Sequence, residues 1–328
     1  MKSIFQDKNI LVTGGTGSIG SEIVRRIMRY EPRVVRIYSN DEDGQFSLGQ
    51  ELQSYSNLRF LIGDVRDKER LKRAMESIDF VFHTAALKQV PLCEYNPFEA
   101  VKTNVLGTQN VIEVAMEENA GRLLTISTDK AVSPINVMGA TKLLAERLTI
   151  SANYYKGARQ TVFSCVRFGN VLETRGSVVP VFREQIKKGG PLMVTDPKMT
   201  RFVMDIPRAA ELVLKAVEMA QGGEIFVFKM PALRVGDLAE AMIEELAPRY
   251  GFSPNSIEVK ITGGRPGEKS YEELMTQEEA SSAYELDDMF ILTPQVLEAK
   301  KATVKRYSSR DEALLSKNEI KTMLEEIL

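Results

Sequence analysis

The sequence predicts an α/β protein with a doubly wound parallel sheet. Short apolar runs rich in β-branched residues alternate with longer stretches of helical periodicity, and a glycine-rich segment follows the first run. Strands of a parallel sheet show such continuous apolar runs because helices cover both faces of the sheet. The alternation therefore favours strands that are joined by helical crossovers.

Six apolar runs are expected as strands, and they lie at residues 10–12, 34–38, 60–62, 80–82, 123–126 and 162–166. Four stretches between them have helical periodicity and suit crossover connections, at residues 22–30, 68–77, 107–118 and 140–155. Six strands match the order of a Rossmann-type dinucleotide-binding sheet. We expect residues 1–170 to form this domain, which also receives segments near residues 205–230.

The regular rhythm loosens after Gly169, where Gly176, Pro180 and Pro197 interrupt it. A smaller substrate-binding domain is therefore expected over residues 171–275. A predicted helix at 211–220 and strand at 225–228 can return to the first domain, and a further helix is expected at 235–246. Residues 276–328 are charged and carry no readable motif, so they form a C-terminal extension of unknown role.

The composition argues against several classes of function. The 328 residues include 43 Lys and Arg against 45 Asp and Glu, so no nucleic-acid-binding or membrane-binding surface is expected. Cys93 and Cys165 lack the spacing of a disulfide framework or a zinc site, which predicts reduced thiols and no bound metal. The chain shows neither a long apolar run nor a signal-peptide pattern. We therefore expect a cytoplasmic protein.

The first predicted strand ends in a glycine-rich loop, Gly14-Gly15-Thr16-Gly17-Ser18-Ile19-Gly20, and a helix opens behind it. Glycines permit the tight turn and let backbone N–H groups approach a pyrophosphate at the helix N-terminus. A plain glycine-rich turn is the alternative. The order of strand, glycines and helix predicts that Gly14, Thr16, Gly17, Ser18, Ile19 and Gly20 bind a nicotinamide dinucleotide.

The second predicted strand ends at Ser39, where an acidic residue would normally bind the ribose hydroxyls of NAD. A small hydroxyl there does not repel a 2′-phosphate, although no arginine follows at once and Asp41 remains available for NAD. We favour NADP, with NAD still possible, and place Ser39 and Asn40 at the cofactor. Asp64 and Val65, after the third strand, are expected at the adenine, but Asp64 is equally suited to cap the next helix.

Two polar segments follow the fifth strand: Ser127-Thr128-Asp129-Lys130, and Met138-Gly139-Ala140-Thr141-Lys142 at the start of the next helix. With them the sequence resembles the extended short-chain dehydrogenases/reductases, and specifically the UDP-N-acetylglucosamine 4,6-dehydratases of polysaccharide biosynthesis. The resemblance covers about residues 7–275. It is also carried by Thr84-Ala85-Ala86-Leu87-Lys88, Arg167-Phe168-Gly169-Asn170-Val171, Thr200-Arg201-Phe202 and Arg265-Pro266-Gly267-Glu268-Lys269.

The resemblance implies that hydride leaves C4 of a hexose for the nicotinamide, water is lost across C5 and C6, and the hydride returns to C6. It makes Lys130 the base at C5, Asp129 the acid at the 6-hydroxyl, Thr128 the group that holds the 4-hydroxyl, and Lys142 a ligand of the nicotinamide ribose. A base must be neutral, so we expect a neighbouring cation such as Lys142, or partial burial, to lower the pKa of Lys130. The alternative for Asp129 and Lys130 is a surface ion pair.

Met138 departs from the family pattern, which has a tyrosine at this position. A thioether has no proton to exchange with a hydroxyl. An inactivated relative in which Met138 simply packs is therefore one alternative. The retained Asp129, Lys130 and Lys142 favour an enzyme, and the resemblance includes active members with Met here. Asp129 is the first candidate to accept the 4-hydroxyl proton.

The other candidate residues are assigned through the same resemblance. Ala85 and Ala86 are expected at the cofactor. Lys88, Met138, Asn170, Arg201, Arg265 and Glu268 are expected at the substrate, since an arginine fork matches a diphosphate and a carboxylate matches ribose hydroxyls. Lys88 is equally consistent with a solvated lysine. His83 is expected as a buried core residue and is not assigned to the site.

These residues predict a 4,6-dehydratase that converts UDP-N-acetylglucosamine to a 4-keto-6-deoxy sugar nucleotide for surface-glycan or rare-sugar biosynthesis. The resemblance also suggests a homo-oligomer. A UDP-sugar 4-epimerase needs chemistry only at C4 and would leave the Asp129-Lys130 pair without a task. A GDP-linked substrate and a non-catalytic dinucleotide-binding protein remain alternatives, and the stereochemistry at C5 stays open.

Overall fold

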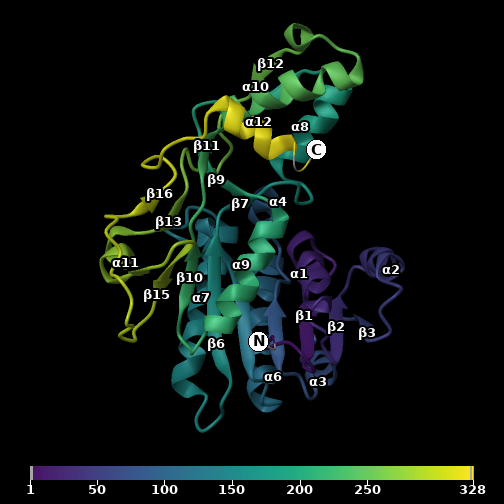
Figure 1. The fold of residues 1–328 in the computed structure, drawn as a ribbon, viewed down its shortest axis with the longest axis vertical. Helices are drawn as coiled ribbons and strands as arrows, with labels where there is room; N and C mark the ends of the chain where they lie inside the picture. The colour runs from purple at the N-terminus through teal and green to yellow at the C-terminus, as the bar shows by residue number, and fades with distance from the viewer. Residues whose placement is uncertain (1–2, 326, 328) are drawn as a thin grey trace.

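The computed structural model describes residues 3–325 and 327. A mostly parallel central sheet with helices on both faces forms the larger part of the molecule, and a smaller part made of helices and short sheets lies above it (Figure 1). The α/β, doubly wound Rossmann-type fold expected from the sequence is confirmed. The boundaries at residues 170 and 275 stay a proposal.

The central sheet has nine strands among the described residues. In spatial order they are β14 (Tyr284–Glu285), β15 (Met289–Leu292), β10 (Ile225–Phe228), β6 (Val162–Phe168), β5 (Arg122–Thr128), β4 (Phe80–His83), β1 (Asn9–Thr13), β2 (Val34–Ser39) and β3 (Leu58–Ile62). The six strands expected from the apolar runs are all present, in the dinucleotide-binding order β3-β2-β1-β4-β5-β6. Only β14 and β15 run antiparallel to their neighbours.

Successive residues of β1 explain why its sequence is apolar throughout. Ile10 and Val12 pack into the core shared with α1 (Ser18–Met28) and α9 (Ile206–Met219), whereas Leu11 packs into the core on the opposite face. The helices of that opposite face are α3 (Lys68–Met75), α6 (Gly107–Glu117) and α7 (Val137–Tyr155), and α2 (Glu42–Glu51) contacts β2 and β3. Both faces of the strand are buried, as a parallel sheet requires.

The smaller part has its own apolar core. It contains a sheet of β7 (Asn170–Val171), β9 (Thr200–Met204) and β11 (Ala232–Arg234), and a pair formed by β8 (Leu192–Val194) and β12 (Val259–Ile261). Its helices are α8 (Val178–Lys187), α10 (Val235–Leu246), α12 (Lys317–Glu325), η3 (Pro248–Tyr250) and η4 (Pro254–Ser256). No helix within residues 3–325 is long and apolar enough to cross a membrane.

The described residues of the segment 276–328, for which the sequence suggested no role, are divided between the two parts. β14 and β15 extend the central sheet, β16 (Tyr307–Ser308) pairs with β13 (Glu273–Met275), and α12 packs on α10. The short helix α11 (Gln277–Ser282) is tied to the sheet by a buried ion group, in which Arg167 of β6 donates to both Glu146 of α7 and Glu279 of α11. The segment is therefore built into the fold.

Candidate active site

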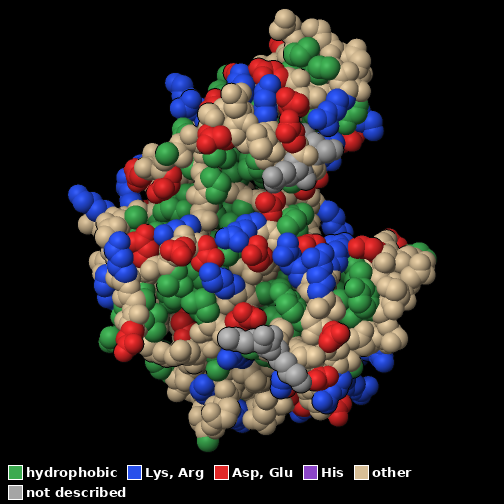
Figure 2. All heavy atoms as spheres, in the orientation of Figure 1, with side chains coloured by type: hydrophobic (Ala, Val, Ile, Leu, Met, Phe, Trp, Pro, Cys, Tyr) green, Lys and Arg blue, Asp and Glu red, His purple; other side chains and the backbone are tan. Residues whose placement is uncertain are grey.

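A cleft of about 1040 Å³ lies at the carboxyl ends of β1, β2, β4, β5 and β6, between the sheet and the smaller part. Ligands of doubly wound proteins bind at this edge of the sheet. Figure 2 shows the surface hollowed between the two parts, on the side of α1 and α8. All the site residues expected from the sequence line the cleft except Asp129: Gly14, Thr16, Gly17, Ser18, Ile19, Gly20, Ser39, Asn40, Asp64, Val65, Ala85, Ala86, Lys88, Thr128, Lys130, Met138, Lys142, Asn170, Arg201, Arg265 and Glu268.

The glycine loop has no room for side chains at two of its positions. Gly14 has φ +66°, and a Cβ there would lie 2.7 Å from the backbone of Ala85. A Cβ at Gly20 would lie 2.5 Å from the carbonyl oxygen of Gly14. The N-cap of α1 is Gly17, which has no side chain to cap the helix, so the N–H groups of its first turn are available to an anion. The loop fits a dinucleotide pyrophosphate.

An arginine that is far away in the sequence, Arg175, contacts the loops at the end of β2. The hydroxyls of Ser39 and Thr16 are hydrogen-bonded at 2.8 Å. Arg175 donates to the Thr16 carbonyl at 2.8 Å and forms an ion pair with Asp41 at 3.2 Å. Hydrogen bonding by the Gly44 N–H, helped by Arg175, lowers the pKa of Asp41. An arginine thus lies at this end of the cleft, although none follows Ser39 in the sequence.

Asp64 does not cap the next helix, which was one of its two expected roles. The N-cap of α3 is Asp67, whose carboxylate accepts the N–H of Arg70 at 2.9 Å. Asp64 instead lines the cleft, where it pairs with Arg66 at 2.7 Å and accepts a hydrogen bond from Asn40 at 3.2 Å. Contact with an adenine therefore stays a proposal for Asp64.

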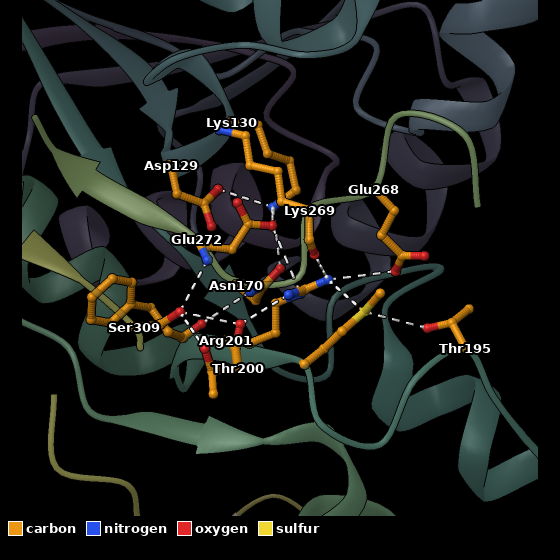
Figure 3. Close-up of polar contacts among 12 residues, drawn as sticks. Asp129, Lys130, Asn170, Thr195, Thr200, Arg201, Glu268, Lys269, Glu272 and Ser309 are labelled. Atoms are coloured by element: carbon orange, nitrogen blue, oxygen red, sulfur yellow. Dashed lines mark hydrogen bonds and ion pairs between the residues drawn. The ribbon is translucent and has the colours of Figure 1, made fainter. Parts of the chain in front are cut away.

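The short helix η2 (Asp129–Ala131) carries Asp129 and Lys130, two of the groups expected to act on the sugar (Figure 3). Thr128 Oγ1 donates to Asp129 Oδ1 at 2.7 Å, and Lys130 Nζ donates to the same oxygen at 2.9 Å. Lys130 Nζ also lies 3.4 Å from Asn170 Oδ1 and 3.4 Å from Glu272 Oε1. Lys130 and Asp129 therefore form a partly buried network, and a surface ion pair is excluded.

The pKa of Lys130 is not lowered, contrary to the expectation from the sequence. Burial opposes the charge, but the Asp129 and Glu272 carboxylates outweigh it and raise the pKa of Lys130 above its ordinary value. Lys142 was the expected neighbouring cation, but its ammonium is directed elsewhere and donates to the Ile126 carbonyl. Lys130 is thus a cation in the protein as it stands.

Asp129 is fully buried and does not line the cleft, and its Oδ2 has no hydrogen-bond partner among the described residues. Glu272, which sequence reasoning missed, does line it. It contacts Lys130 and lies 3.7 Å from Arg201 Nε. Its position in the sequence could have indicated Glu272 as a site residue, because it closely follows the Arg265-to-Lys269 motif.

The first two turns of α7 carry Met138 and Lys142. Met138 is 4% exposed and packs against Cys93 of α4 (Val90–Tyr95) and Ala100 of α5 (Pro97–Ala100), while it still lines the cleft. Lys142 Nζ donates to the Ile126 carbonyl at 2.6 Å. Burial lowers the pKa of Lys142 to about 8. Met138 therefore has both a packing role and a face toward the cleft.

The substrate-side residues differ in how firmly they are held. Arg201 donates to the carbonyls of Thr200 and Lys269 and lies 3.5 Å from Glu268 Oε1. The N-cap residue of α7, Asn136, donates to the Gly267 carbonyl at 2.8 Å and so fixes this loop. Arg265 and Lys88 are exposed at the edge of the cleft. Arg201 is thus preorganised, whereas Arg265 and Lys88 are free to adjust.

Two buried residues near the cleft serve the fold. His83 is 2% exposed and its ring nitrogens are hydrogen-bonded to the hydroxyls of Thr13 and Thr108. Burial, together with Lys142, lowers its pKa to about 3, so His83 is the neutral core residue that the sequence predicted. Asn104, in the π-helical turn η1 (Val101–Leu106), holds the backbone of Leu87 beside Lys88. Sequence reasoning missed Asn104.

The family model described as "Polysaccharide biosynthesis protein" matches residues 10–294. The chain belongs to this family. Its fold is that of the extended short-chain dehydrogenases/reductases, as the motifs had indicated. A solved structure described as Pen from Bacillus thuringiensis is 47% identical, has a TM-score of 0.95 and covers 98% of each chain.

Curated relatives carry different names. "Uncharacterized membrane protein MJ1061" of Methanocaldococcus jannaschii is 59% identical over 100% of this chain and 98% of its own length. An inverting UDP-N-acetylglucosamine 4,6-dehydratase of Campylobacter jejuni is 42% identical over 89% of this chain and 85% of its length. A UDP-glucose 4-epimerase of Rickettsia rickettsii is 38% identical over 98% of this chain and 96% of its length. Membership of the family therefore leaves the reaction to be argued from the site.

Proposed function

We propose that the protein is a nucleotide-sugar 4,6-dehydratase that acts on UDP-N-acetylglucosamine. The observation that carries the proposal is Lys130, which lines the cleft beyond the glycine loop and contacts the carboxyl groups of Asp129 and Glu272. Removal of a proton from carbon needs a base, and a neighbouring acid–base group can exchange protons with that base. The similarity to the Campylobacter jejuni dehydratase supports the same reaction.

Each residue has a place in this reaction. A bound nicotinamide dinucleotide would accept hydride from C4 and return it to C6. Lys130, as a neutral amine, takes the C5 proton. Asp129 accepts the 4-hydroxyl proton when hydride leaves C4 and then gives this proton to the departing 6-hydroxyl, which leaves as water. Because the Asp129 side chain is buried, both transfers need a small movement of η2 or pass through Thr128. Thr128 holds the 4-hydroxyl.

We assign the cofactor as NADP. Gly14, Thr16, Gly17, Ser18, Ile19 and Gly20 would hold its pyrophosphate, Ser39 and Asn40 its adenosine ribose, Asp64, Val65, Ala85 and Ala86 its adenine side, and Lys142 its nicotinamide ribose. Ser39 leaves space for a 2′-phosphate without charge repulsion, and Arg175 stands next to it as a cation. Asp41, which pairs with Arg175, is the group that would favour NAD instead.

On the substrate side, Arg201, Arg265, Glu268, Lys88, Asn170 and Met138 would receive the sugar nucleotide. Arg201 already points its guanidinium toward a carboxylate, so a diphosphate can replace or share that partner. Met138 would contact the sugar through its thioether and cannot take the role of a tyrosine hydroxyl. A homo-oligomer and a location in the cytoplasm remain predictions from the sequence.

A 4-epimerase is the second candidate function, because relatives with that name are similar over nearly the whole chain. Epimerisation exchanges hydrogen at C4 only and gives no task to a lysine beside two carboxyl groups. The same two functions differ in the expected product. A dehydratase releases water and forms a 6-deoxy sugar, whereas an epimerase returns an isomer of equal mass.

The decisive experiment incubates the purified protein with UDP-N-acetylglucosamine and NADP in deuterium oxide and follows the sugar by NMR. A 6-deoxy-4-keto product that carries deuterium at C5 is expected. UDP-N-acetylgalactosamine without deuterium at C5 would identify an epimerase instead. An unchanged UDP-N-acetylglucosamine beside a converted GDP-mannose would move the substrate to the GDP sugars, and no turnover of either sugar would favour a dinucleotide-binding protein without catalysis.

A further inference from the structure

Glu272 is a buried carboxyl group to which none of the steps above gives a task. Its side chain is 3% exposed, and Oε1 lies 3.4 Å from Lys130 Nζ and 3.7 Å from Arg201 Nε (Figure 3). The other oxygen, Oε2, has no hydrogen-bond partner among residues 3–325 and 327. A buried carboxylate oxygen without a partner is unfavourable, so this position favours a proton.

Glu272 and Asp129 differ in how closely polar groups and cations approach their oxygens. Asp129, Lys130, Arg201 and Lys269 face it, from η2, from β9 and from the loop before β13. Burial, and then Asp129, raise the pKa of Glu272 against the effect of the three cations. Asp129 Oδ1 accepts two short hydrogen bonds, at 2.7 Å and 2.9 Å, whereas the nearest cations lie 3.4 Å and 3.7 Å from Glu272 Oε1. Glu272 is thus the carboxyl group best placed to take up a proton.

Lys130 presents the complementary problem. Its ammonium donates to Asp129 and Asn170 and forms an ion pair with Glu272, and its pKa is raised, so it holds no free electron pair for a C–H bond. Loss of its proton to solvent would be rare near neutral pH. A proton acceptor inside the site removes this difficulty, because transfer replaces two buried charges by two neutral groups.

We propose that Glu272 stores the proton that Lys130 must give up before it can act as the base, an inference that rests on the proposed dehydratase function. One N–H bond of Lys130 breaks and one O–H bond forms on Glu272. Lys130 then takes the C5 proton, later returns a proton to C5, and recovers its own from Glu272. All protons balance and no electrons are gained or lost. Glu272 acts through Lys130, so it is a positioning residue.

The C-terminal segment holds Glu272 in this place. The N–H of Glu272 donates to Ser309 Oγ at 3.0 Å, and the N–H of Ser309 donates to the Glu272 carbonyl at 2.9 Å. The next residue, Glu273, pairs with Ser308 in the ladder of β13 and β16. Residues 307–309 thereby fix the carboxyl group against η2, which gives part of the segment 276–328 a role in the site.

The test is the pH dependence of dehydration by the variant Glu272→Gln, which keeps the shape and removes the proton acceptor. Internal transfer in the wild type makes the rate nearly independent of pH around neutrality. In E272Q the neutral lysine forms only by loss of a proton to solvent. We expect the rate at pH 7 to fall at least about tenfold and then to rise about tenfold per pH unit up to the pKa of Lys130. The matched control, Glu273→Gln, should keep the wild-type rate and profile.

A second variant guards against a folding defect. Glu272→Ala leaves space for a small acid, so added formate is expected to restore part of its rate, whereas formate should not help Lys130→Ala. A loss of rate by the same factor at every pH, without rescue by formate, would show a structural role and overturn the proposal. So would an unchanged E272Q. Failure of the dehydratase assignment is distinct, since the wild type itself would then form no 6-deoxy product.

Discussion

Among the lysines that line the cleft, Lys130 and Lys142 have surroundings that move their pKa values in opposite directions. Lys130, at the end of β5, contacts the carboxyl groups of Asp129 and Glu272, and its pKa is raised. Lys142, in α7, donates to a backbone carbonyl, and burial lowers its pKa to about 8. Burial opposes the charge of both lysines. The contacting carboxylates, and not the depth of the site, therefore decide which lysine stays charged.

The nearest carboxylate to Lys142 along α7 explains the difference. Glu146 lies one helical turn further on and would face Lys142, but its two oxygens accept hydrogen bonds from Arg167 at 2.6 Å and 3.1 Å. Arg167 also donates to Glu279. Glu146 is thus already neutralised, and Lys142 gains little from it. The ion group that anchors α11 to the sheet thus leaves Lys142 without a carboxylate partner among the described residues.

Replacement of Lys130 is expected to have the largest effect. Lys130→Ala removes the proposed base at C5, and general-base groups contribute about 10²- to 10⁴-fold, so we expect the rate of dehydration to fall about 10³-fold. NMR in deuterium oxide would follow formation of the 6-deoxy sugar and deuterium entry at C5. Lys198→Ala, an exposed lysine outside the cleft, should behave as the wild type. Persistence of C5 exchange at full rate in K130A would contradict the assignment of the base.

Removal of Arg167 should affect stability more than any other change discussed here. Arg167→Met leaves the fully buried Glu146 without its partner, and breaking a buried pair in this way costs about 3–5 kcal/mol. Urea unfolding would measure the loss. The double variant Glu146→Gln/Arg167→Met should recover part of it, because no unpaired charge then remains. A single variant as stable as the wild type would show that this buried ion pair contributes nothing to stability.

The cost of burying Lys142 gives a pH-dependent prediction. Its folded-state pKa of about 8 lies below its ordinary value of 10.5, so the folded protein releases the proton first. The unfavourable charge is present below pH 8, and stability should rise as the pH increases from about 8 to 10.5. Lys142→Met should therefore raise the free energy of unfolding at pH 7 by about 1–3 kcal/mol and flatten its rise above pH 8.

Thermal unfolding of the protein without cofactor, at pH 7 and pH 10, would measure this difference. Lys72→Met, at an exposed ion pair with Glu117, is the control and should leave the pH dependence unchanged. Equal stability of K142M and the wild type at both pH values would show that Lys142 is not strained by its burial. The same variant should bind the dinucleotide more weakly if Lys142 holds the nicotinamide ribose.

The local sequence predicted the six parallel strands and many of the residues that line the cleft. The apolar runs located the six strands, because a parallel strand that is buried on both faces is apolar throughout and is recognisable on its own. The run 289–292 was not recognised, because β15 pairs antiparallel with β10 and β14 and no helical crossover precedes it as in the parallel strands. The motif residues gather in one cleft because motifs at the carboxyl ends of parallel strands meet at one edge.

What the sequence could not predict depends on contacts between distant segments. Glu272 reaches Lys130 because β13 lies against η2, and no periodicity reports this packing. The raised pKa of Lys130 follows from that contact, so the expectation of a lowered pKa was wrong for the same reason. Arg175 reaches Asp41 across 134 residues of chain. Its loop has breakers but no pattern that points to the end of β2.

Replacement of Arg175, at the exposed end of the cleft, is expected to have the smallest effect, and it tests the choice between NADP and NAD. Its ion pair with Asp41 is solvent-exposed, so its removal should hardly change stability. If Arg175 contacts a 2′-phosphate, Arg175→Ala should weaken NADP binding about tenfold and leave NAD binding nearly unchanged. Fluorescence titration with the two cofactors measures the ratio. Arg175→Lys should retain part of the preference, because a charge remains without the planar fork. Equal losses for NADP and NAD would instead place Arg175 at the pyrophosphate or in the support of the Thr16 loop.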